Sequence, residues 1–482
     1  MHYRELDVPF SKMVKRLLFS FLAGISLFGA SADVITDAQA LMEGGDYAAA
    51  AGLLSRDMAS LKAARQGAAN QMLGECLYEL GDYDAARGCF DKAKAKGVAE
   101  ASLYLGRLDF LDYNYDSASD NYSRYRELMR KSRKDVAEEV DAEEERLRLA
   151  EGFLERVEKI AIIDSINLFE KDFFKSYRLP PSAGSLHDAS VLPFKNTDEI
   201  TGAVFVNEGR DRMLWSQTDA DGLQRLMETQ LLTDGTWQEP VMIEGLAAGS
   251  DAAWPFMMGD GVTLYFASDG DDSLGGYDIF VANRDATTGQ FMQPQNIGMP
   301  YNSPADDYMF ALDELNNVGW WATNRNSPEG CVTVYVFVPN DLRRNYDTEM
   351  DDVASYARVD DYKATWGNED YSELLAEIAQ IDPSAIPKKI DFHLPMPDRR
   401  EYTSYDDFRS SEAKSLAKKY FSEQKQLAKA EDELQEMRRR YHASRTATLG
   451  GKIKLAEENI ERRRADLMKI RSDVYKAEAS GR

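Results

Sequence analysis

The chain has 482 residues and a formal net charge of −25, which comes from 83 acidic and 58 basic side chains. Because the excess acid is spread along the whole chain, the sequence argues against nucleic-acid binding and against adsorption to an anionic membrane surface. The length predicts two or three domains, and a hydrophobic fraction of 43% is enough to build their cores.

The N-terminus has the pattern of a secretory signal peptide. Basic side chains precede an apolar run at 17–30, and Ala30-Ser31-Ala32 fits a small-x-small cleavage site. The run is shorter than the roughly 20 residues that span a bilayer. We therefore predict a signal peptide at 1–32, translated from Met1 or from Met13. The mature chain would lie in the periplasm, either soluble or peripheral to the outer membrane. A buried N-terminal helix is the alternative.

A helical repeat follows, over residues 33–159. Three related turns are spaced by 36 and 32 residues: Gly45-Asp46-Tyr47, Gly81-Asp82-Tyr83 and Tyr113-Asn114-Tyr115. Small residues such as Gly74 and Gly106 stand where paired helices would cross closely. The pattern resembles the tetratricopeptide repeat, although no tryptophan opens a unit and no proline closes one. An ordinary helical bundle is the alternative, and a solvating helix is predicted at 131–159.

Stacks of such repeats present a concave face to peptides or partner proteins. We single out Asn70, Tyr78 and Tyr104 as candidate partner-binding residues on that face. The acidic run at 138–145 is interpreted as a solvated helix face, not as a binding site.

Residues 160–405 alternate short strands with polar turns. The clearest unit is the hairpin 261–285, whose strands at Thr263–Ala267 and Tyr277–Ala282 flank an acidic, glycine-rich turn. Related hairpins lie on both sides, with aligned positions 52 and 55 residues apart: Trp215-Ser216, Ala267-Ser268 and Ala322-Thr323. Repeats of about 40–50 residues that contain several strands are typical of β-propeller blades. A β-sandwich with chance similarity between its hairpins is the alternative.

Three such units are clear, whereas propellers usually close with four or more blades. The missing strands are expected from 160–205, where Ile160–Phe169 is strand-like, from 340–405, or from a partner. Within 340–405 we also predict a helix at Tyr371–Gln380 and a short strand pair at Ile390–Leu394 and Arg400–Thr403.

Residues 406–482 form the last predicted domain. Apolar side chains step by seven along two charged stretches, from Tyr420 to Tyr441 and from Ile453 to Val474, and Leu449-Gly450-Gly451 interrupts them. This pattern predicts two helices in an antiparallel coiled coil. The apolar residues spaced by seven are first a packing surface between the two helices. We hypothesise that the hairpin also acts as an assembly arm that self-associates.

The predicted fold class is thus a multidomain α + β protein. It has an N-terminal tetratricopeptide α-solenoid, a central β-propeller that is either incomplete or closed by flanking strands, and a C-terminal antiparallel helical hairpin.

Signals of catalysis are sparse. None of the four histidines lies in a recognisable catalytic motif, and no glycine loop suited to a phosphate is present. Cys76, Cys89 and Cys331 are too few for a disulfide framework, and the first two are interpreted as packing residues. We predict no catalytic residues and no cofactor.

The turn of the central hairpin offers one further candidate site. Clustered carboxylates that include Asp269 and Asp272 suit a calcium ion, but aspartates in such turns usually cap backbone amides, so no metal is predicted. With Trp320 and Trp321 these aspartates form a candidate ligand surface. Because neighbouring strand residues point to opposite faces, one tryptophan is expected to be exposed. Asp278 is expected to accept backbone hydrogen bonds from the adjoining blade.

The stretch LYFASDG…GGYDIFVANRD, at 264–285, resembles the WD-repeat-like propeller repeat of TolB-type periplasmic proteins. The longer run from Trp254 to Arg325 is similar to a family of Gram-negative envelope proteins in which such a propeller follows tetratricopeptide repeats. The resemblance covers roughly residues 34–340. It implies a non-catalytic scaffold that binds protein partners, linked to outer-membrane integrity or protein secretion. The OmpA-like domain of some relatives is not recognised here. A glycan- or peptide-binding propeller, or an unusual hydrolase, is the alternative.

Overall fold

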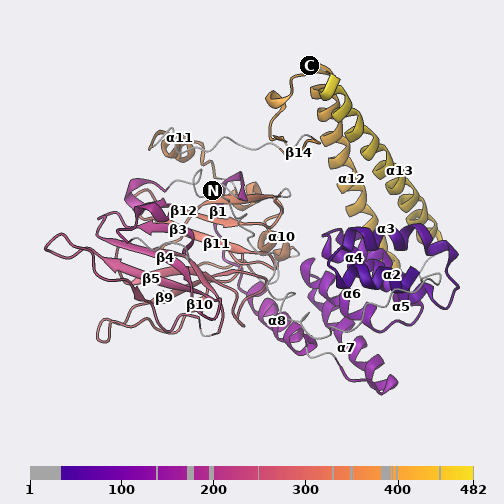
Figure 1. Ribbon diagram of the computed structural model, residues 1–482, viewed down its shortest axis with the longest axis horizontal. Coiled ribbons are helices and arrows are strands. Elements are labelled where there is room, and N and C mark those ends of the chain that lie inside the picture. Colours follow the sequence, from indigo (N-terminus) through magenta and orange to yellow (C-terminus); the bar gives the residue numbers. More distant parts are fainter. Residues whose placement is uncertain are drawn as a thin grey trace, which may run out of the picture. The chain divides into compact units, whose positions relative to one another are not determined.

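The computed structural model describes residues 34–480, apart from 137–138, 171–178, 195–199, 248, 328–329, 348–349, 351, 368, 382–391, 393, 398–399 and 445–446. The protein is a mixed α + β protein, as predicted (Figure 1). It divides into two compact units, and the main boundary falls between residues 387 and 388. The helical repeats share the first unit with the sheets, and the domain boundary predicted at 405 stays a prediction. The predicted signal peptide lies outside the described residues.

Helices follow one another in pairs within residues 34–132, all of which are described. The pairs are α2 (Val34–Glu43) with α3 (Tyr47–Asp57), α4 (Gln66–Glu79) with α5 (Tyr83–Ala95), and α6 (Glu100–Leu111) with α7 (Tyr115–Ser132). In each connecting turn one residue takes a positive φ, of 78° at Gly45, 76° at Gly81 and 58° at Tyr113. The residue after it is the N-cap of the next helix, and the carboxylates of Asp46 and Asp82 each accept the backbone N–H three residues on. The three predicted turn motifs thus occupy equivalent positions.

The two helices of a pair cross closely at a glycine. A Cβ atom at Gly74 would lie 2.6 Å from the ring of Phe90, and one at Gly106 would lie 2.4 Å from the ring of Tyr122. Both rings are fully buried. These contacts, which the sequence pattern predicts, fix the packing of α4 on α5 and of α6 on α7.

The described strands of the first unit form three antiparallel sheets, ordered β2-β3-β4-β5-β6, β10-β9-β8-β7 and β1-β13-β12-β11 (Figure 1). Their bounds are β1 (Ala161–Phe169), β2 (Ser185–His187), β3 (Ile200–Val206), β4 (Arg212–Thr218), β5 (Gln224–Gln230), β6 (Val241–Met242), β7 (Ala252–Met257), β8 (Thr263–Ser268), β9 (Asp278–Asn283), β10 (Gln295–Asn296), β11 (Asp307–Asp313), β12 (Val318–Thr323) and β13 (Cys331–Val338). The strand predicted at Ile160–Phe169 is β1, and it completes the third sheet beside β13.

The three sheets repeat one backbone detail. Strands β3, β7 and β11 each contain a β-bulge, and within it one residue has a positive φ: Gly202 (73°), Trp254 (54°) and Met309 (57°). These positions are 52 and 55 residues apart, which is the spacing found between the hairpins in the sequence. The spacing between repeats that was predicted from the sequence is therefore also the spacing between equivalent backbone positions.

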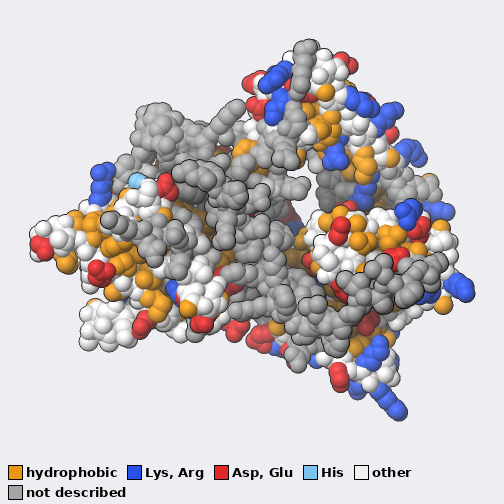
Figure 2. Space-filling model, viewed as in Figure 1, with side chains coloured by type: hydrophobic (Ala, Val, Ile, Leu, Met, Phe, Trp, Pro, Cys, Tyr) orange, Lys and Arg blue, Asp and Glu red, His pale blue; other side chains and the backbone are white. Residues whose placement is uncertain are grey.

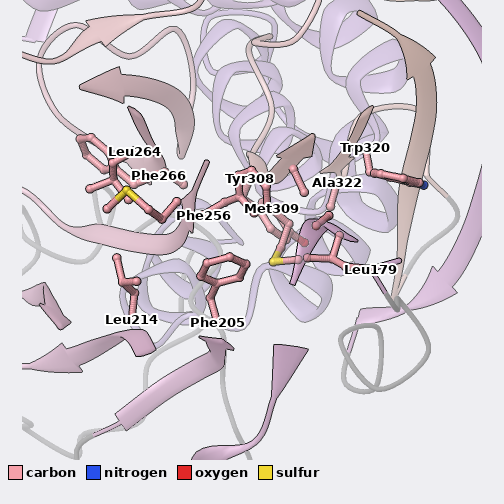
Figure 3. Packing of buried hydrophobic residues seen from close by; sticks show 14 of the residues in the cluster. Leu179, Phe205, Leu214, Phe256, Leu264, Phe266, Tyr308, Met309, Trp320 and Ala322 are labelled. Carbon is pink, nitrogen blue, oxygen red and sulfur yellow. The ribbon is translucent and has the colours of Figure 1, made fainter. Parts of the chain in front are cut away.

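Side chains from all three sheets meet in one hydrophobic cluster. Figure 3 shows Phe205 of β3, Phe256 of β7 and Tyr308 of β11 lying within it. Trp254 lies between the first and third sheets. Its ring approaches Gly202 so closely that a Cβ atom there would be 3.0 Å away, and it stacks on Tyr308 with ring centroids 5.5 Å apart. The region where the sheets meet is therefore filled by apolar side chains.

Further helices connect and cover these parts of the first unit. Helix α8 (Glu139–Leu154) is shorter than the helix predicted at 131–159, and it packs in a cluster that also holds Leu274 and Met299 from the loops of the sheets. Helix α10 (Val353–Arg358) joins the same cluster. Helix α11 (Ser372–Ile381) confirms the helix predicted at Tyr371–Gln380, and its Leu374 and Leu375 contact the sheet core.

The second unit contains the predicted helical hairpin. Helices α12 (Ser411–Ser444) and α13 (Ala447–Ser480) pack through heptad residues that include Leu427, Leu434 and Ile460. The predicted interruption is wrong in position, because Gly450 lies inside α13. A two-residue strand pair, β14 (Leu394–Pro395) and β15 (Glu401–Tyr402), packs on the end of the hairpin where α13 finishes.

Glu478 connects the end of α13 to the beginning of α12. Its carboxylate is 2% exposed and accepts the N–H groups of Arg409 and Ser410, at 3.0 and 3.1 Å, and the hydroxyl of Tyr402 at 2.8 Å. Burial alone would raise the pKa of Glu478, but these hydrogen bonds outweigh it and the pKa is lowered. The charged carboxylate thus stabilises the hairpin end.

We expect Glu478→Gln to destabilise the second unit by about 1–3 kcal/mol, since the two backbone donors lose a charged acceptor. Because the folded-state pKa lies below the unfolded value of 4.5, the contribution of the carboxylate is present above that value and disappears as the pH falls through the folded pKa. Urea unfolding of the full chain, followed by circular dichroism at pH 7 and pH 3, measures both effects. A deficit of equal size at the two pH values would contradict this role.

Candidate functional site

Two of the three predicted partner-binding residues come together on the helical pairs. Tyr78 of α4 lies edge-on to Tyr104 of α6, with ring centroids 5.6 Å apart, and also contacts Tyr83 of α5 at 5.3 Å. Tyr104 in turn stacks on Phe90 at 4.8 Å. Tyr78 and Tyr104 are half-buried and Tyr83 is 41% exposed. We call Tyr78, Tyr83 and Tyr104 the tyrosine row.

The third predicted residue, Asn70, lies elsewhere. It is buried, and its side-chain amide donates to the carbonyl of Gln66 in its own helix at 2.6 Å and to the sulfur of Met58 at 3.8 Å. These contacts give Asn70 a packing role between α4 and the preceding segment, so the structure does not bring it to the tyrosine row.

Charged side chains surround the tyrosine row. The guanidinium of Arg107 lies over the ring of Tyr104, 5.0 Å from its centroid, and donates to Glu143 of α8 at 2.9 Å. Glu75 and Glu79 stand one helical turn apart on α4. Burial is the main cause that raises the pKa of each of these two carboxyl groups. Burial also raises the pKa of Tyr78 and of Tyr104. The result is a partly buried, aromatic and acidic face that α4 and α6 present together.

The predicted ligand surface on the sheets is not formed by its tryptophans. Trp320 is 6% exposed and lies in the core between the sheets, whereas Trp321 is fully buried in a second cluster on the opposite face of β12. The two rings do point to opposite faces, but the expectation that one is exposed is wrong, because both faces of β12 are covered. Asp269 and Asp272 are exposed.

The Asp278 carboxylate accepts its hydrogen bonds from the turn before β9 and from β10 of the same sheet, whereas the prediction placed the donors in the adjoining blade. The carboxylate accepts the N–H of Leu274 at 3.0 Å and the amide of Asn296 at 2.7 Å. Burial raises the pKa of Asp278 well above its usual value. The predicted mechanism, in which a carboxylate accepts a backbone N–H from another sheet, operates at two other residues.

Asp251 and Asp306 connect the sheets, and they stand 55 residues apart at the beginning of β7 and β11. The carboxylate of Asp251 accepts the N–H of Gln224 in the first sheet at 2.9 Å, and that of Asp306 accepts the N–H of Tyr277 in the second at 2.9 Å. Tyr277 also donates its hydroxyl to Asp251 at 3.0 Å. Each sheet is thus joined to the next by an equivalent hydrogen bond.

The predicted ligand residue Asp269 belongs to this system. Its carboxylate accepts the N–H of Asp251 at 2.7 Å, and Asn324, 55 residues on, accepts the N–H of Asp306 at 2.9 Å in the same way. The sequence signal for all four residues was present, because each lies at an aligned repeat position directly before or after a strand.

The buried ion pair of Arg325 and Asp307 could not be recognised from the repeat positions in the sequence. Arg325 donates to Asp307 at 2.6 Å, and the two side chains are 6% and 0% exposed. Arg325 also donates to the carbonyls of Pro300, at 2.7 Å, and of Tyr301. Asp307 accepts the N–H and the hydroxyl of Ser303, both at 2.7 Å. The pair therefore ties β11 to the loop that precedes it.

Within the described residues, no group of three or more His, Cys, Asp or Glu side chains is placed to hold a metal ion. Cys76, Cys89 and Cys331 are all buried. In the part of the chain that the structure describes, no helix combines the length and the apolar character needed to cross a membrane.

No known family model, curated protein or solved structure matches the chain. The resemblance to TolB-type envelope proteins therefore stays a prediction, and the function has to be argued from the residues of this chain.

Proposed function

We propose that this protein is a non-catalytic scaffold of the bacterial envelope, in which tetratricopeptide-like helical pairs bind a partner protein. The helical assignment is supported by the equivalent turns at Gly45, Gly81 and Tyr113 and by the glycine–aromatic crossings at Gly74 and Gly106. The hairpin of α12 and α13 would serve assembly.

The three sheets would be blades of a β-propeller that offers a second surface. The repeated bulges, the equivalent links through Asp251 and Asp306, and the completion of the last sheet by the early strand β1 all support this proposal. Figure 2 shows hydrophobic side chains exposed among acidic ones on the visible face of the sheets. Met242 and Met292, on outer strands or turns, are 49% and 51% exposed, which suits a protein-binding surface.

The observation that carries the adaptor role is the tyrosine row. Tyrosines that are partly exposed and backed by packed helices supply apolar contact area and a polar group with little loss of side-chain freedom, which is why they are enriched at protein interfaces. Tyr78 and Tyr104 come from different helical pairs, so a partner that contacts both is held by the stack and not by a single helix.

Photocrosslinking in the cell tests this role. Benzoylphenylalanine, which keeps an aromatic ring, would replace Tyr78 in the full chain, and the matched control would carry it at Leu315, which is 81% exposed on the sheets. We expect a covalent adduct with a partner protein from position 78 that is absent from position 315. No adduct at 78, or the same adduct from both positions, would contradict the proposal.

The periplasmic location rests on residues 1–32. Fusion of residues 1–40 to a phosphatase that is active only in the periplasm should give an active enzyme. Loss of activity when a charged residue interrupts the apolar run at 17–30 would support export through this segment, whereas activity that is indifferent to the charge would oppose it.

A further inference from the structure

Acidic side chains dominate the surface beside the tyrosine row. Glu75 and Glu79 of α4 stand at i and i+4, a spacing at which like charges repel. Glu100, at the beginning of α6, adds to the repulsion that Glu75 experiences. Both α4 carboxyl groups have a raised pKa, caused first by burial. This arrangement disfavours the charged carboxylates in the protein alone.

Arg107, the cation that lowers the pKa of both carboxyl groups, is already paired with Glu143. Arg107 donates to Glu143 at 2.9 Å, and Glu143 also accepts from Arg146 at 3.5 Å. Arg107 lowers the pKa of Glu75 and of Glu79, but burial outweighs it. The face therefore carries more negative charge than its own cations compensate.

The amide oxygen of Gln71, a buried acceptor on α4, is a second feature of this acidic face. Gln71, one turn before Glu75 on α4, is 6% exposed, and its amide nitrogen donates to the Glu75 carboxylate at 2.8 Å. Its amide oxygen is buried and accepts no hydrogen bond within the described structure. A ligand with several hydrogen-bond donors is thus suited both to the carboxylates and to this oxygen.

The ring of Tyr104 shows how a guanidinium can be held here. Arg107 already lies over that ring at 5.0 Å, and the ring of Tyr78 lies edge-on beside it. Tyrosine faces attract cations, and a guanidinium offers five donors in a planar fork that suits carboxylates.

We propose that the face formed by Glu75, Glu79, Gln71 and the tyrosine row binds an arginine-bearing peptide segment of the partner protein. The arginine side chain lies against Tyr78, because Phe90 and Arg107 already cover the ring of Tyr104, and it donates to the α4 carboxylates and to the Gln71 amide oxygen. This inference rests on the proposed adaptor function, and it assigns the chemistry of the segment that is bound.

Selection of displayed random dodecapeptides against the full chain tests the inference. We expect arginine to be enriched among the retained peptides. The fluorescein-labelled form of the most enriched peptide should lose about tenfold in affinity, measured by fluorescence anisotropy, when its arginine is replaced by the neutral isostere citrulline. Glu75→Gln combined with Glu79→Gln should cause a loss of similar size, and the citrulline peptide should be indifferent to that double variant.

The matched control is Glu145→Gln on α8, a carboxylate whose side chain is 73% exposed and pairs with Arg148, and it should leave the affinity unchanged. Peptides that bind equally well with citrulline, or that are enriched in acidic residues, would overturn the arginine inference while leaving the adaptor role standing. If no peptide is retained and position 78 gives no adduct, both proposals fail.

Discussion

Replacing Arg325 by methionine is expected to lower the free energy of unfolding of the first unit by about 3–5 kcal/mol, because the change leaves the Asp307 carboxylate buried without its cation. The loss extends beyond the pair, since the guanidinium also satisfies the carbonyls of Pro300 and Tyr301. Urea unfolding of the full chain, followed by tryptophan fluorescence, measures the change. Arg56→Met is the control, because that arginine pairs with Asp57 on the surface and its loss should leave the unfolding midpoint unchanged.

The pH dependence of the stability of Arg325→Met shows whether the unpaired Asp307 carboxylate causes the loss. Burial, opposed by Arg325, already raises the pKa of Asp307 above its unfolded value of 3.8. Without the cation the folded pKa should rise further, so the folded protein keeps its stability only where Asp307 is protonated. The deficit of Arg325→Met should therefore be smaller near pH 4, where the lost hydrogen bonds to the Pro300 and Tyr301 carbonyls remain, and grow as the pH rises toward 7. Addition of Asp307→Asn should restore part of the lost stability at pH 7. A deficit that is independent of pH would contradict a buried charge as the cause.

Gly106→Ala and Gly88→Ala are expected to change stability in opposite directions, although both glycines lie inside helices of the repeats. A Cβ atom at Gly106 would meet the Tyr122 ring at 2.4 Å, and the fully buried ring has little room to move, so a loss of about 1–3 kcal/mol is expected. At Gly88 no atom lies within 4 Å of the new Cβ, so alanine should stabilise the helix by about 0.5–1 kcal/mol.

The far-ultraviolet circular dichroism of the full chain in urea measures this contrast. Two variants that shift the midpoint in the same direction would show that helix propensity, and not the crossing of α6 on α7, decides the effect at Gly106.

The sequence predicts the elements of this protein well because their signals are local. The turns at Gly45 and Gly81 are set by a positive φ and a capping aspartate, and both belong to short motifs. The strands were recognisable from β-branched and aromatic residues bounded by glycine-rich turns, and the bulges at Trp254 and Met309 repeat at the spacing seen between hairpins. The position of Gly450 was misread, since a glycine near the beginning of a long helix costs only about 1 kcal/mol and does not end it.

What the sequence could not predict depends on contacts between distant residues. Arg325 and Asp307 pair because the β11–β12 register places Asp307 opposite Thr323, two residues before Arg325, and neither residue lies in a motif that indicates this. Trp320 and Trp321 are both buried because β12 is covered on both faces, whereas alternation assumes that one face meets water. For the tyrosine row, the helical pattern placed Tyr78 and Tyr104 together. It could not separate Asn70, whose hydrogen bond to Gln66 keeps it within its own helix.

The position of β1 has a consequence for the order in which the parts of the chain can fold. This strand precedes every other strand in the order of synthesis, yet its partner β13 ends at Val338, so the third sheet must wait for about 170 residues to be made. The helical pairs depend only on near neighbours and can acquire their structure as they emerge. Until the residues up to Val338 are available for folding, β1 lacks its partner strand, and in that period a chaperone or a second chain could pair with it.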